Sequence, residues 1–493
     1  MALTIPALFD AAVEEVPDKT WLLHEDASFT YAEARERVAR VAGALAERGI
    51  GRGDLVLGTA HNRPEYVFTW FACAYLGAIW VPTDPRATEA ELNGLIGQVQ
   101  PKLVVKQELA ADPIELAHAA GEDDPVVLIP TSGTTGRSKL VTQTQRAYAM
   151  AGEGFPWWME LGPDDRLMTS LPLFHVNAPA YSVLGSVGAR ASVVLLPRFS
   201  ASTFIDSARR YGATEFNAIG AMLEILMRQP ERSDDADNPL RLCYTGPSPT
   251  KERQLEMEER YGLRIVCGYA MSESPYGLIW KHGTRPYGTL GSVRQHPTLG
   301  VVNEGRVVDG ELQLRNPTVM KGYWGMPEET ESVLLPDGWL RTGDLVEDNG
   351  DGTYTFVGRQ KEVIRRRGEN VAPAEIEEAL MSHPDVLEAA VVGVPSDLSE
   401  EEIKAFVVTG DGADLAAIRD HAAALLTRFK VPRYIEALAE LPHTATGRVA
   451  KHRLPAERTD AELDFEDGHS LSGHGRPGEA PDHRDAGPDA PRR

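Results

Sequence analysis

A loop rich in glycine and hydroxyl residues spans residues 131–139 and reads TSGTTGRSK. It follows the apolar run VVLIP (residues 126–130), which predicts a buried strand, so we expect a strand-to-helix loop. Glycine allows the backbone to approach a ligand closely, hydroxyl and amide groups donate hydrogen bonds, and Lys139 adds a positive charge. This composition suits a polyanion such as a chain of phosphates. The loop is not a Walker A motif, and a plain surface loop is the less favoured alternative.

A second stretch near the end of the chain, LPHTATGRVAKHR (residues 441–453), places three cations after a polar turn. Arg448, Lys451 and Arg453 follow Thr446-Gly447 in quick succession. The residues alone leave two interpretations open, a solvated basic edge or a cation that takes part in chemistry.

Several further stretches follow in a set order, and together they resemble a known family. They are LPLFHVNA (171–178), GYAMSES (268–274), GELQLRNPTVMKGYW (310–324), GWLRTGDL (338–345), GRQKEVIRRRGEN (358–370) and TATGRVAK (444–451). With TSGTTGRSK they resemble the motifs of the adenylate-forming superfamily of acyl- and aryl-CoA synthetases, peptide-synthetase adenylation domains and luciferases. The resemblance covers about residues 10–455. It implies ATP- and Mg²⁺-dependent adenylation of a small acid with release of pyrophosphate, and CoA as the co-substrate.

The resemblance also implies roles around the nucleotide. Tyr269 would stack on adenine, Asp344 would accept hydrogen bonds from the ribose hydroxyls, and Glu273 would help to hold Mg²⁺ near the phosphates. Without the flanking motifs the same residues would be interpreted as core packing, a turn and solvated surface. The complete set expected to bind ATP is Thr131, Ser132, Gly133, Thr134, Thr135, Gly136, Lys139, Gly246, Tyr269, Ser272, Glu273, Asp344 and Arg359.

Other residues are expected at the acid and CoA sites. His175 would form the gate or floor of the acid site, although a lone histidine is more often a core residue. Lys361 takes the hinge position, about which the small C-terminal domain would rotate between adenylation and thioester formation. The residues expected to contact the acid or CoA are His175, Asn217, Gly220, Gly268, Gly368 and Asn370.

The last motif departs from the family pattern at Arg448, where a lysine ordinarily bridges the carboxylate of the acid and the α-phosphate. Arginine keeps the charge but presents a larger, planar group. Three interpretations of Arg448 stay open. The chain is a carboxylate–CoA ligase with altered geometry, a ligase for another acid, or a homologue that only binds nucleotide or acyl-adenylate. The second case includes a diazotase that activates nitrite and acts on an aromatic amine in natural-product biosynthesis. Ala270, Leu140 and Gly246-Pro247 depart from the pattern as well.

The elements that must position these residues alternate between strands and helices. Apolar runs such as 54–60, 78–84, 191–197, 213–219 and 240–246 predict strands, and amphipathic segments lie between them. This alternation predicts an α/β fold, with a large N-terminal domain of helix-covered, mostly parallel sheets plus a β-subdomain. A small, mobile α+β domain follows. We expect an N-terminal domain over residues 1–358, a C-terminal domain over 359–455 and a disordered tail over 456–493.

Composition excludes several classes of function. The formal net charge of −23 argues against binding to nucleic acid or acidic membranes. Three distant cysteines give no metal-ligand spacing and favour a cytoplasmic location. The start of the chain does not resemble a signal peptide, and the apolar run 66–81 is too short to span a membrane, so a buried helix is expected. The choice of acid, an aromatic one included, stays open, as does monomer or homodimer.

Overall fold

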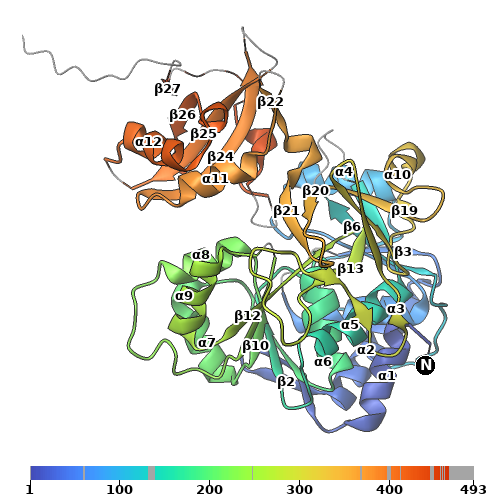
Figure 1. The fold of residues 1–493 in the computed structure, drawn as a ribbon. Helices are drawn as coiled ribbons and strands as arrows, with labels where there is room; N and C mark the ends of the chain where they lie inside the picture. Colours follow the sequence, from blue (N-terminus) through green and yellow to red (C-terminus); the bar gives the residue numbers. More distant parts are fainter. Residues whose placement is uncertain are drawn as a thin grey trace, which may run out of the picture.

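The computed structural model describes residues 2–465 apart from residues 59–61, 132–138, 247, 367–368, 397–400, 411, 445–448, 456, 458 and 460. The chain forms a large N-terminal part and a small C-terminal part, which lies above it in Figure 1. Helices cover sheets that contain long parallel runs, and an antiparallel sheet adjoins them. The expected α/β fold class is therefore confirmed.

The largest sheet has nine strands in the order β14-β13-β12-β11-β10-β8-β9-β1-β2. Strands β12, β11, β10, β8, β9 and β1 are parallel, and the strands at both edges are antiparallel. The carboxyl ends of the parallel strands meet at one edge, where side chains can converge on a ligand. The bounds are Thr20–His24 (β1), Ala27–Thr30 (β2), Arg166–Thr169 (β8), Ser192–Leu195 (β9), Glu215–Asn217 (β10), Leu242–Thr245 (β11), Arg264–Met271 (β12), Ser274–Ile279 (β13) and Ser292–Val293 (β14).

A second sheet has six strands in the order β19-β7-β6-β4-β3-β5. Strands β5, β3, β4 and β6 are parallel, whereas β6 and β7 form an antiparallel hairpin and β19 pairs with the other edge of β7. The bounds are Leu55–Gly58 (β3), Ile79–Pro82 (β4), Leu103–Val105 (β5), Pro125–Thr131 (β6), Lys139–Thr144 (β7) and Gly322–Tyr323 (β19).

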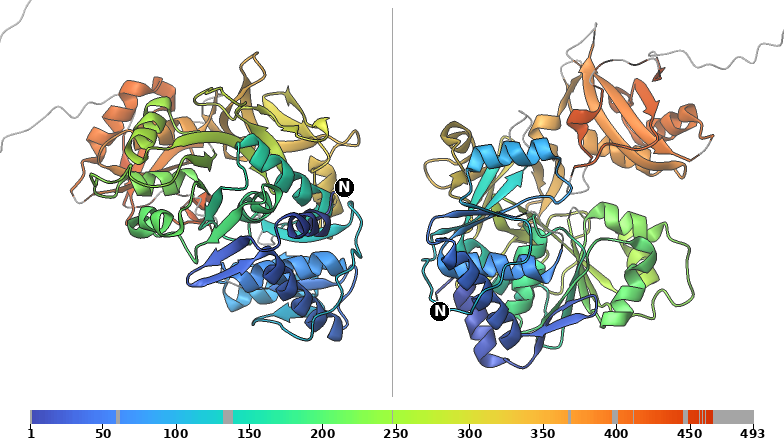
Figure 2. Two further views of the ribbon diagram at one scale, coloured as in Figure 1. Left: turned by 90° about the horizontal axis from the view of Figure 1, so that it is seen from below. Right: turned by 180° about the vertical axis from the view of Figure 1, so that it is seen from behind.

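One continuous hydrophobic core joins these two sheets to the helices around them. Figure 2 shows these sheets and helices from below and from behind. Helix α2 begins at a capping box, in which the Thr30 side chain accepts from the Glu33 amide and the Glu33 carboxylate accepts from the Thr30 amide. The helices are Ile5–Glu15 (α1), Tyr31–Glu47 (α2), Pro64–Leu76 (α3), Glu89–Val99 (α4), Gln145–Trp158 (α5), Leu184–Gly188 (α6), Phe204–Tyr211 (α7), Gly220–Met227 (α8), Lys251–Tyr261 (α9) and Pro327–Val333 (α10).

The apolar run 66–81 is divided between helix α3 and strand β4. Gly77 ends the helix in the left-handed conformation, with φ of +68°, which glycine adopts without strain. The expected buried helix is thus shorter than the apolar run. No helix within the described residues is long and apolar enough to cross a membrane.

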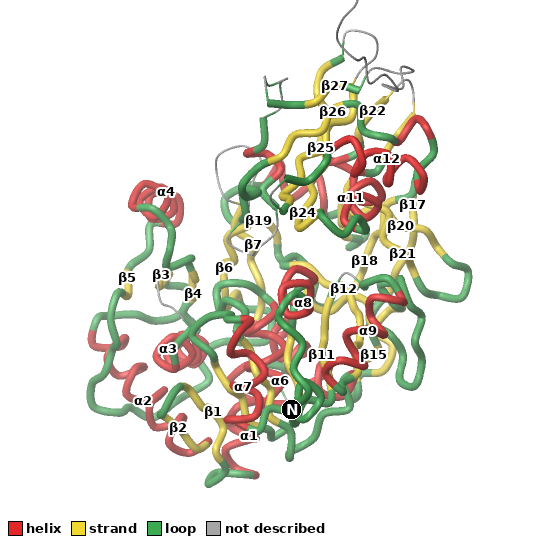
Figure 3. Tube along the Cα trace, turned by 90° about the vertical axis from the view of Figure 1, so that its left-hand side faces the viewer, coloured by secondary structure: helices red, strands yellow, loops and turns green. Residues whose placement is uncertain are grey.

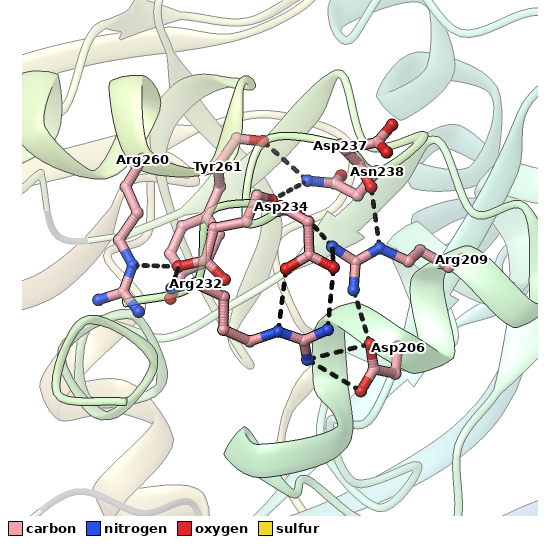
Figure 4. Close-up of polar contacts among 9 residues, drawn as sticks. Asp206, Arg209, Arg232, Asp234, Asp237, Asn238, Arg260 and Tyr261 are labelled. Carbon is pink, nitrogen blue, oxygen red and sulfur yellow. Dashed lines mark hydrogen bonds and ion pairs between the residues drawn. The ribbon is translucent and has the colours of Figure 1, made fainter. Parts of the chain in front are cut away.

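A charged network links helices α7 and α9 to the loop between α8 and β11 (Figure 4). The Arg232 guanidinium donates to the carboxylates of Asp206 and Asp234, and Arg209 donates to Asp206. Arg260 Nε donates to Asp235 Oδ2 at 2.8 Å, and both of these side chains are almost fully buried. The network fixes the helices beside β10, β11 and β12, so it supports the strands that carry the candidate site.

Two four-stranded sheets follow, and β15-β16 and β22-β23 each form a two-stranded sheet. The β-subdomain is an antiparallel sheet in the order β17-β18-β20-β21, and the C-terminal part has the sheet β24-β25-β26-β27 with two helices and a hairpin. The bounds are Gln295–His296 (β15), Gly300–Val301 (β16), Glu304–Val308 (β17), Glu311–Arg315 (β18), Leu340–Asp348 (β20), Tyr354–Arg359 (β21), Ile364–Arg366 (β22), Glu369–Val371 (β23), Pro373–Met381 (α11), Val386–Pro395 (β24), Glu401–Thr409 (β25), Leu415–Leu425 (α12), Tyr434–Ala437 (β26) and Leu463–Asp464 (β27).

The C-terminal part faces helix α8 of the N-terminal part (Figures 1 and 3). Arg228, at the end of α8, donates to the carbonyl oxygen of Leu387. Strand β21 continues through Arg359, and residues 360–362 form a short 3-10 turn before the C-terminal hairpin. The expected boundary at residue 358 therefore falls at the end of β21, and it stays a prediction.

The expected start of a disordered tail at residue 456 needs correction, because strand β27 lies beyond it and pairs with β26. Ion pairs with buried and half-buried cations attach strand β27 to the C-terminal part. The Lys404 ammonium is fully buried and lies 2.8 Å from a Glu436 oxygen and 2.6 Å from a Glu462 oxygen. Arg433 also pairs with Asp464 at 2.8 Å. Residues 466–493 lie outside the described residues.

Glu215, on β10, gives a testable prediction for stability. Its carboxylate is fully buried with no hydrogen-bond partner for either oxygen, and burial raises its pKa well above the usual value, with the Asp165 charge adding to the shift. The folded protein therefore keeps this proton to higher pH than the unfolded chain does, and it loses stability as pH rises above 4.5. We expect Glu215→Gln to raise the melting temperature at about pH 8 by a few degrees, since about 1 kcal/mol shifts it by roughly 2–4 °C in a domain of about 150–250 residues and by less in a larger one.

Calorimetry at a series of pH values measures this effect. The gain in melting temperature should shrink as the pH falls towards the ordinary carboxyl pKa of 4.5. Residue 215 is then neutral in the unfolded chains of both the wild type and the variant as well as in the folded proteins. The exposed Glu47, changed to glutamine, is the matched control and should leave the pH dependence as it is. An equal gain at every pH would contradict the assignment of the titration to Glu215.

Candidate active site

Three residues expected at the nucleotide come together where β12 meets the β-subdomain. The Tyr269 hydroxyl donates to Asp344 Oδ2 at 2.5 Å, and Arg359 Nε lies 2.9 Å from Asp344 Oδ1. Asp344 and Arg359 are register partners on β20 and β21. The ladder between these strands therefore sets the acid and the cation opposite each other.

Burial determines the charge states in this cluster. Asp344 is 1% exposed, so its carboxylate depends on Arg359 for compensation. Burial raises the pKa of Tyr269 well above its usual value, and the charge of Asp344 adds to the shift, so the phenol stays a donor. A carboxylate offers about four lone pairs. Asp344 can thus accept further donors, such as the two hydroxyls of a ribose, while it holds Tyr269 and Arg359.

A second cluster joins Glu273, Tyr323 and Lys139. The Tyr323 hydroxyl donates to Glu273 Oε1 at 2.9 Å, and Lys139 Nζ lies 4.5 Å from the centre of the Tyr323 ring. The backbone fixes the positions, because Met320 N donates to the Glu273 carbonyl and Gln143 Nε2 donates to the Ser272 carbonyl. Strand β7, the turn after β12 and strand β19 therefore meet here.

Burial raises the pKa of Glu273, while the Tyr323 hydrogen bond and the Arg359 charge act in the opposite direction and Asp344 adds to the rise. The two clusters are thus close enough to interact electrostatically. No group of three or more potential metal ligands occurs among the described residues. Mg²⁺ bound with a nucleotide needs only one or two protein carboxylates because phosphates and water complete its coordination, and Glu273 fits that role.

The glycine-rich loop turns out to be the connection of a β-hairpin. Thr131 and Lys139 are register partners at the ends of β6 and β7, and Thr131 Oγ1 donates to the Lys139 carbonyl at 3.2 Å. The expected strand-to-helix loop was therefore wrong, and these strands supply no helix N-terminus for a phosphate. Of the residues expected to bind ATP, Ser132, Gly133, Thr134, Thr135 and Gly136 lie outside the described residues.

Two expected glycines have a steric reason in the packing of β11 against β12. A Cβ atom on Gly246 would lie 2.4 Å from the carbonyl oxygen of Gly268, and one on Gly268 would lie 2.8 Å from the Tyr244 hydroxyl. Glycine at both positions lets the carboxyl ends of the two strands approach each other beside Tyr269.

Residues expected at the acid lie at the same edge of the sheet. Asn217 ends β10, is 1% exposed and donates from Nδ2 to Asn177 Oδ1 at 2.8 Å. Gly220 is the first residue of α8. His175 packs on Phe174 and lines a small cavity whose other walls are largely aromatic, formed by Tyr66, Trp70, Trp80, Pro82, Val127, Ile129, Tyr148, Leu173, Phe174 and Pro179.

The C-terminal residues are only partly described. The backbone of Lys361 lies in the 3-10 turn 360–362 and that of Asn370 lies in β23, whereas Gly368 and Arg448 lie outside the described residues. Lys451 Nζ lies 2.8 Å from both Glu362 Oε2 and Glu377 Oε1. The last motif is therefore attached to the expected hinge through this ammonium.

Sequence reasoning missed Tyr323 and the pairing of Lys451. Tyr323 lies within the recognised motif GELQLRNPTVMKGYW, so its presence was visible, but its contact with Glu273 depends on the pairing of β19 with β7. The contacts of Lys451 join segments 89 residues apart, which no local spacing indicates.

Comparisons with known proteins agree with this geometry. Residues 9–122 and 110–324 match the family model described as AMP-binding enzyme, and residues 375–448 match that of the AMP-binding enzyme C-terminal domain. The chain is 30% identical to the crotonobetaine/carnitine–CoA ligase of Salmonella heidelberg (strain SL476), over 89% of this chain and 96% of that relative.

Solved structures are similar as well. ATP-bound MatB from Rhodopseudomonas palustris superposes with a TM-score of 0.83 at 26% identity, over 92% of this chain and 98% of that one. The apo form of the same protein gives a TM-score of 0.72 over the same shares. O-succinylbenzoate coenzyme A synthetase from Bacillus subtilis, in complex with AMP, gives 0.81 at 25% identity, over 91% and 97%.

Asp344 gives a prediction for nucleotide binding. Asp344→Asn removes the charge that pairs with Arg359 and weakens the acceptor for hydroxyl donors. A hydrogen bond to a charged group contributes about 1.5–3 kcal/mol, so we expect ATP affinity to fall by about 10- to 100-fold. Isothermal titration calorimetry measures the change, and Asp351→Asn, at an exposed turn, is the control. Unchanged affinity would exclude Asp344 from the nucleotide site.

Tyr323 gives a prediction for pH dependence. Its hydrogen bond lowers the pKa of Glu273 against the effect of burial, so Tyr323→Phe raises that pKa further. The protonated acid cannot ligate Mg²⁺, so the loss of Mg²⁺-dependent ATP affinity on acidification should begin at higher pH in the variant. At about pH 6 we expect affinity to be weaker by roughly 10-fold.

Titrations of ATP with and without Mg²⁺ at a series of pH values make this measurement. Tyr354→Phe is the control, since this buried tyrosine lies in β21 away from Glu273. An acid limb that does not move, or that moves equally without Mg²⁺, would contradict a metal role for Glu273.

Proposed function

The chain belongs to the AMP-binding enzyme family, and on that premise we propose that it is an ATP-dependent ligase that adenylates a small carboxylic acid and transfers the acyl group to coenzyme A. The observation that carries the proposal is that the Asp344 cluster and the Glu273 cluster lie close enough to interact electrostatically. Asp344 with Arg359 and Tyr269 suits a nucleoside, and Glu273 with Tyr323 and Lys139 suits phosphates.

In the first step an oxygen of the acid attacks the α-phosphorus of ATP. The bond from that phosphorus to the oxygen bridging the β-phosphate breaks, and pyrophosphate leaves with the electron pair. Tyr269 and Asp344 would fix the nucleoside, and Lys139 would stabilise the leaving phosphates. Mg²⁺, held beside Glu273, would offset phosphate charge. Fixing both reactants in one site accounts for much of the rate through proximity.

In the second step the sulfur of coenzyme A attacks the acyl carbon, the thiol proton is lost to solvent and AMP leaves. We propose that residues 359–455, extended by β27, rotate about Lys361 between the steps and bring Gly368 and Asn370 to the CoA site. The higher TM-score to ATP-bound MatB than to its apo form supports an arrangement suited to the first step.

We propose that Arg448 replaces the usual lysine beside the α-phosphate. The pairing of Lys451 with Glu362 and Glu377 supports this assignment, because Lys451 already forms ion pairs with two carboxylates and is half-buried at the hinge. A guanidinium can donate to two oxygens at once, which suits an anionic transition state that joins an acid to a phosphate.

Pyrophosphate release with ATP and a panel of acids, followed by CoA-dependent release of AMP, tests the function. We expect Arg448→Ala to lower the rate of pyrophosphate exchange by about 100-fold or more, the usual loss when a group that stabilises transition-state charge is removed. Thioester formation from a supplied acyl-adenylate should change far less, because the C-terminal part has then rotated and its last motif no longer acts on the α-phosphate.

Arg453→Ala is the matched control, because this arginine is exposed and five residues further along. An equal loss in both half-reactions, or an equal loss for both arginines, would overturn the assignment of Arg448 to adenylation. ATP binding without pyrophosphate release from any acid would overturn the proposed ligase.

A further inference from the structure

The space between the large sheet and helix α5, next to the acid side of the site, is filled by large side chains. Tyr244 points into it from β11, Tyr276 from β13, and Tyr181 from the π-helical segment 178–183. Phe155 of α5 and Arg294 complete the set. We call Phe155, Tyr181, Tyr244, Tyr276 and Arg294 the tyrosine cage; each is at most 3% exposed.

The cage is closely packed. Phe155 stacks on Tyr181 at 5.1 Å between ring centres, and Tyr244 lies 5.3 Å from Phe155 and 5.6 Å from Tyr181. The guanidinium carbon of Arg294 lies 5.3–5.8 Å from the rings of Tyr181, Tyr244 and Tyr276. Four aromatic rings and a guanidinium therefore occupy the space beside Asn217, the register partner of Tyr244.

Two glycines allow the tyrosine rings to pack closely against the neighbouring backbone. A Cβ atom on Gly154 of α5 would lie 2.4 Å from the Tyr276 ring, and one on Gly268 would lie 2.8 Å from the Tyr244 hydroxyl. The tyrosines thus fill the spaces that larger residues at these positions would occupy. The cavity beside His175 gives no alternative, because its volume of about 10 Å³ is that of roughly one water molecule.

Arg294 holds the cage in place and gives it a positive charge. Its Nη2 atom donates to the Tyr244 hydroxyl at 2.5 Å and its Nε donates to the Leu278 carbonyl at 3.2 Å. Within the described ranges no carboxylate forms an ion pair with it. A buried cation without an acidic partner favours an anion nearby. Tyr244 accepts from Arg294 and is the register partner of Asn217, so it connects this cation to the residue expected at the acid.

The end of the acid site next to the cage is polar. Asn217 and Tyr244 are register partners on β10 and β11, so their side chains lie on the same face of the sheet. Asn217 Nδ2 donates to Asn177 Oδ1 and, at 3.3 Å, to Ser182 Oγ, whereas Asn217 Oδ1 is buried without a hydrogen-bond partner. An unpaired buried acceptor is costly, and a hydroxyl, an amino group or a water bound with the acid would satisfy it.

We propose that the acid adenylated by this protein is a small polar oxyanion, limited in length by Tyr244 and the tyrosine cage and contacted by Asn217. This inference rests on the proposed function and names the substrate class of the same site. Short carboxylic acids with a hydroxyl or amino group share this chemistry with inorganic oxyanions of the size of nitrite.

Pyrophosphate release by the full-length protein with ATP and Mg²⁺ tests the proposal. The small probes are acetate, glycolate, glycine and nitrite, and the large probes are butyrate, hexanoate and benzoate. We expect kcat/KM to be highest within the small set and to fall by about 10-fold or more once the acid reaches the cage, as for a methylene that a pocket cannot accept. Glycolate or glycine above acetate would support the contact with Asn217.

Two variants of Tyr244 separate size from polarity. Tyr244→Ala removes the ring, so we expect kcat/KM for butyrate or benzoate relative to acetate to rise by about 10-fold or more. Tyr244→Phe keeps the ring and loses only the hydroxyl that accepts from Arg294, so it should keep the size limit. Asn217→Leu should lower the preference for glycolate over acetate, with the change in KM rather than in ATP affinity.

The outcomes distinguish this inference from the proposed function. A wild-type preference for butyrate, hexanoate or benzoate would overturn the size limit while the ligase function stands. Turnover with nitrite alone, without CoA-dependent release of AMP, would support the size limit and overturn the carboxylate–CoA ligase. Should Tyr244→Ala not fold, the wild-type series and Tyr244→Phe still decide, because a long acid accepted by either contradicts the role of the ring.

Discussion

The buried carboxylate of Asp344 is the constraint on which the candidate site depends. An acid with 1% exposure needs a cation and donors, and the structure supplies Arg359 from the next strand and Tyr269 from the large sheet. This single group therefore joins the end of β12, the β-subdomain and the strand that leads to the C-terminal part. The same arrangement leaves lone pairs for a ribose. The folded structure and the proposed nucleotide site thus both depend on Asp344 remaining a paired carboxylate.

Much of this could be predicted from the sequence, because the motifs are local. Alternating strands and helices predicted the α/β fold, and the motifs around Tyr269, Asp344 and Arg359 named residues that the structure brings together. Local patterns could not predict contacts made through pairing of distant strands. Tyr323 reaches Glu273 only because β19 joins β7, and the loop after Thr131 was misassigned because its strand partner lies on the other side of the loop itself.

The acid side shows the same limit of sequence reasoning more strongly. Asn217 was expected at the acid from the sequence, whereas Tyr244, Tyr276 and Arg294 come from three separate segments, and no local pattern indicates that they meet. Glycines at 154 and 268 leave the space that the tyrosine rings fill, but a glycine in the sequence does not indicate which side chain approaches it. The residues expected at the nucleotide are therefore encoded in contiguous motifs, whereas the side chains next to the acid come from scattered positions.

Strand β27 connects the far end of the described chain to the interior of the C-terminal part. Glu462 and Glu436 together balance the buried ammonium of Lys404, and Arg433 holds the strand from outside through Asp464. A polypeptide emerging from the ribosome cannot complete this charge balance until Glu462 and Asp464 have been made. The C-terminal part would therefore acquire its final stability only after the large sheets and the nucleotide edge already exist.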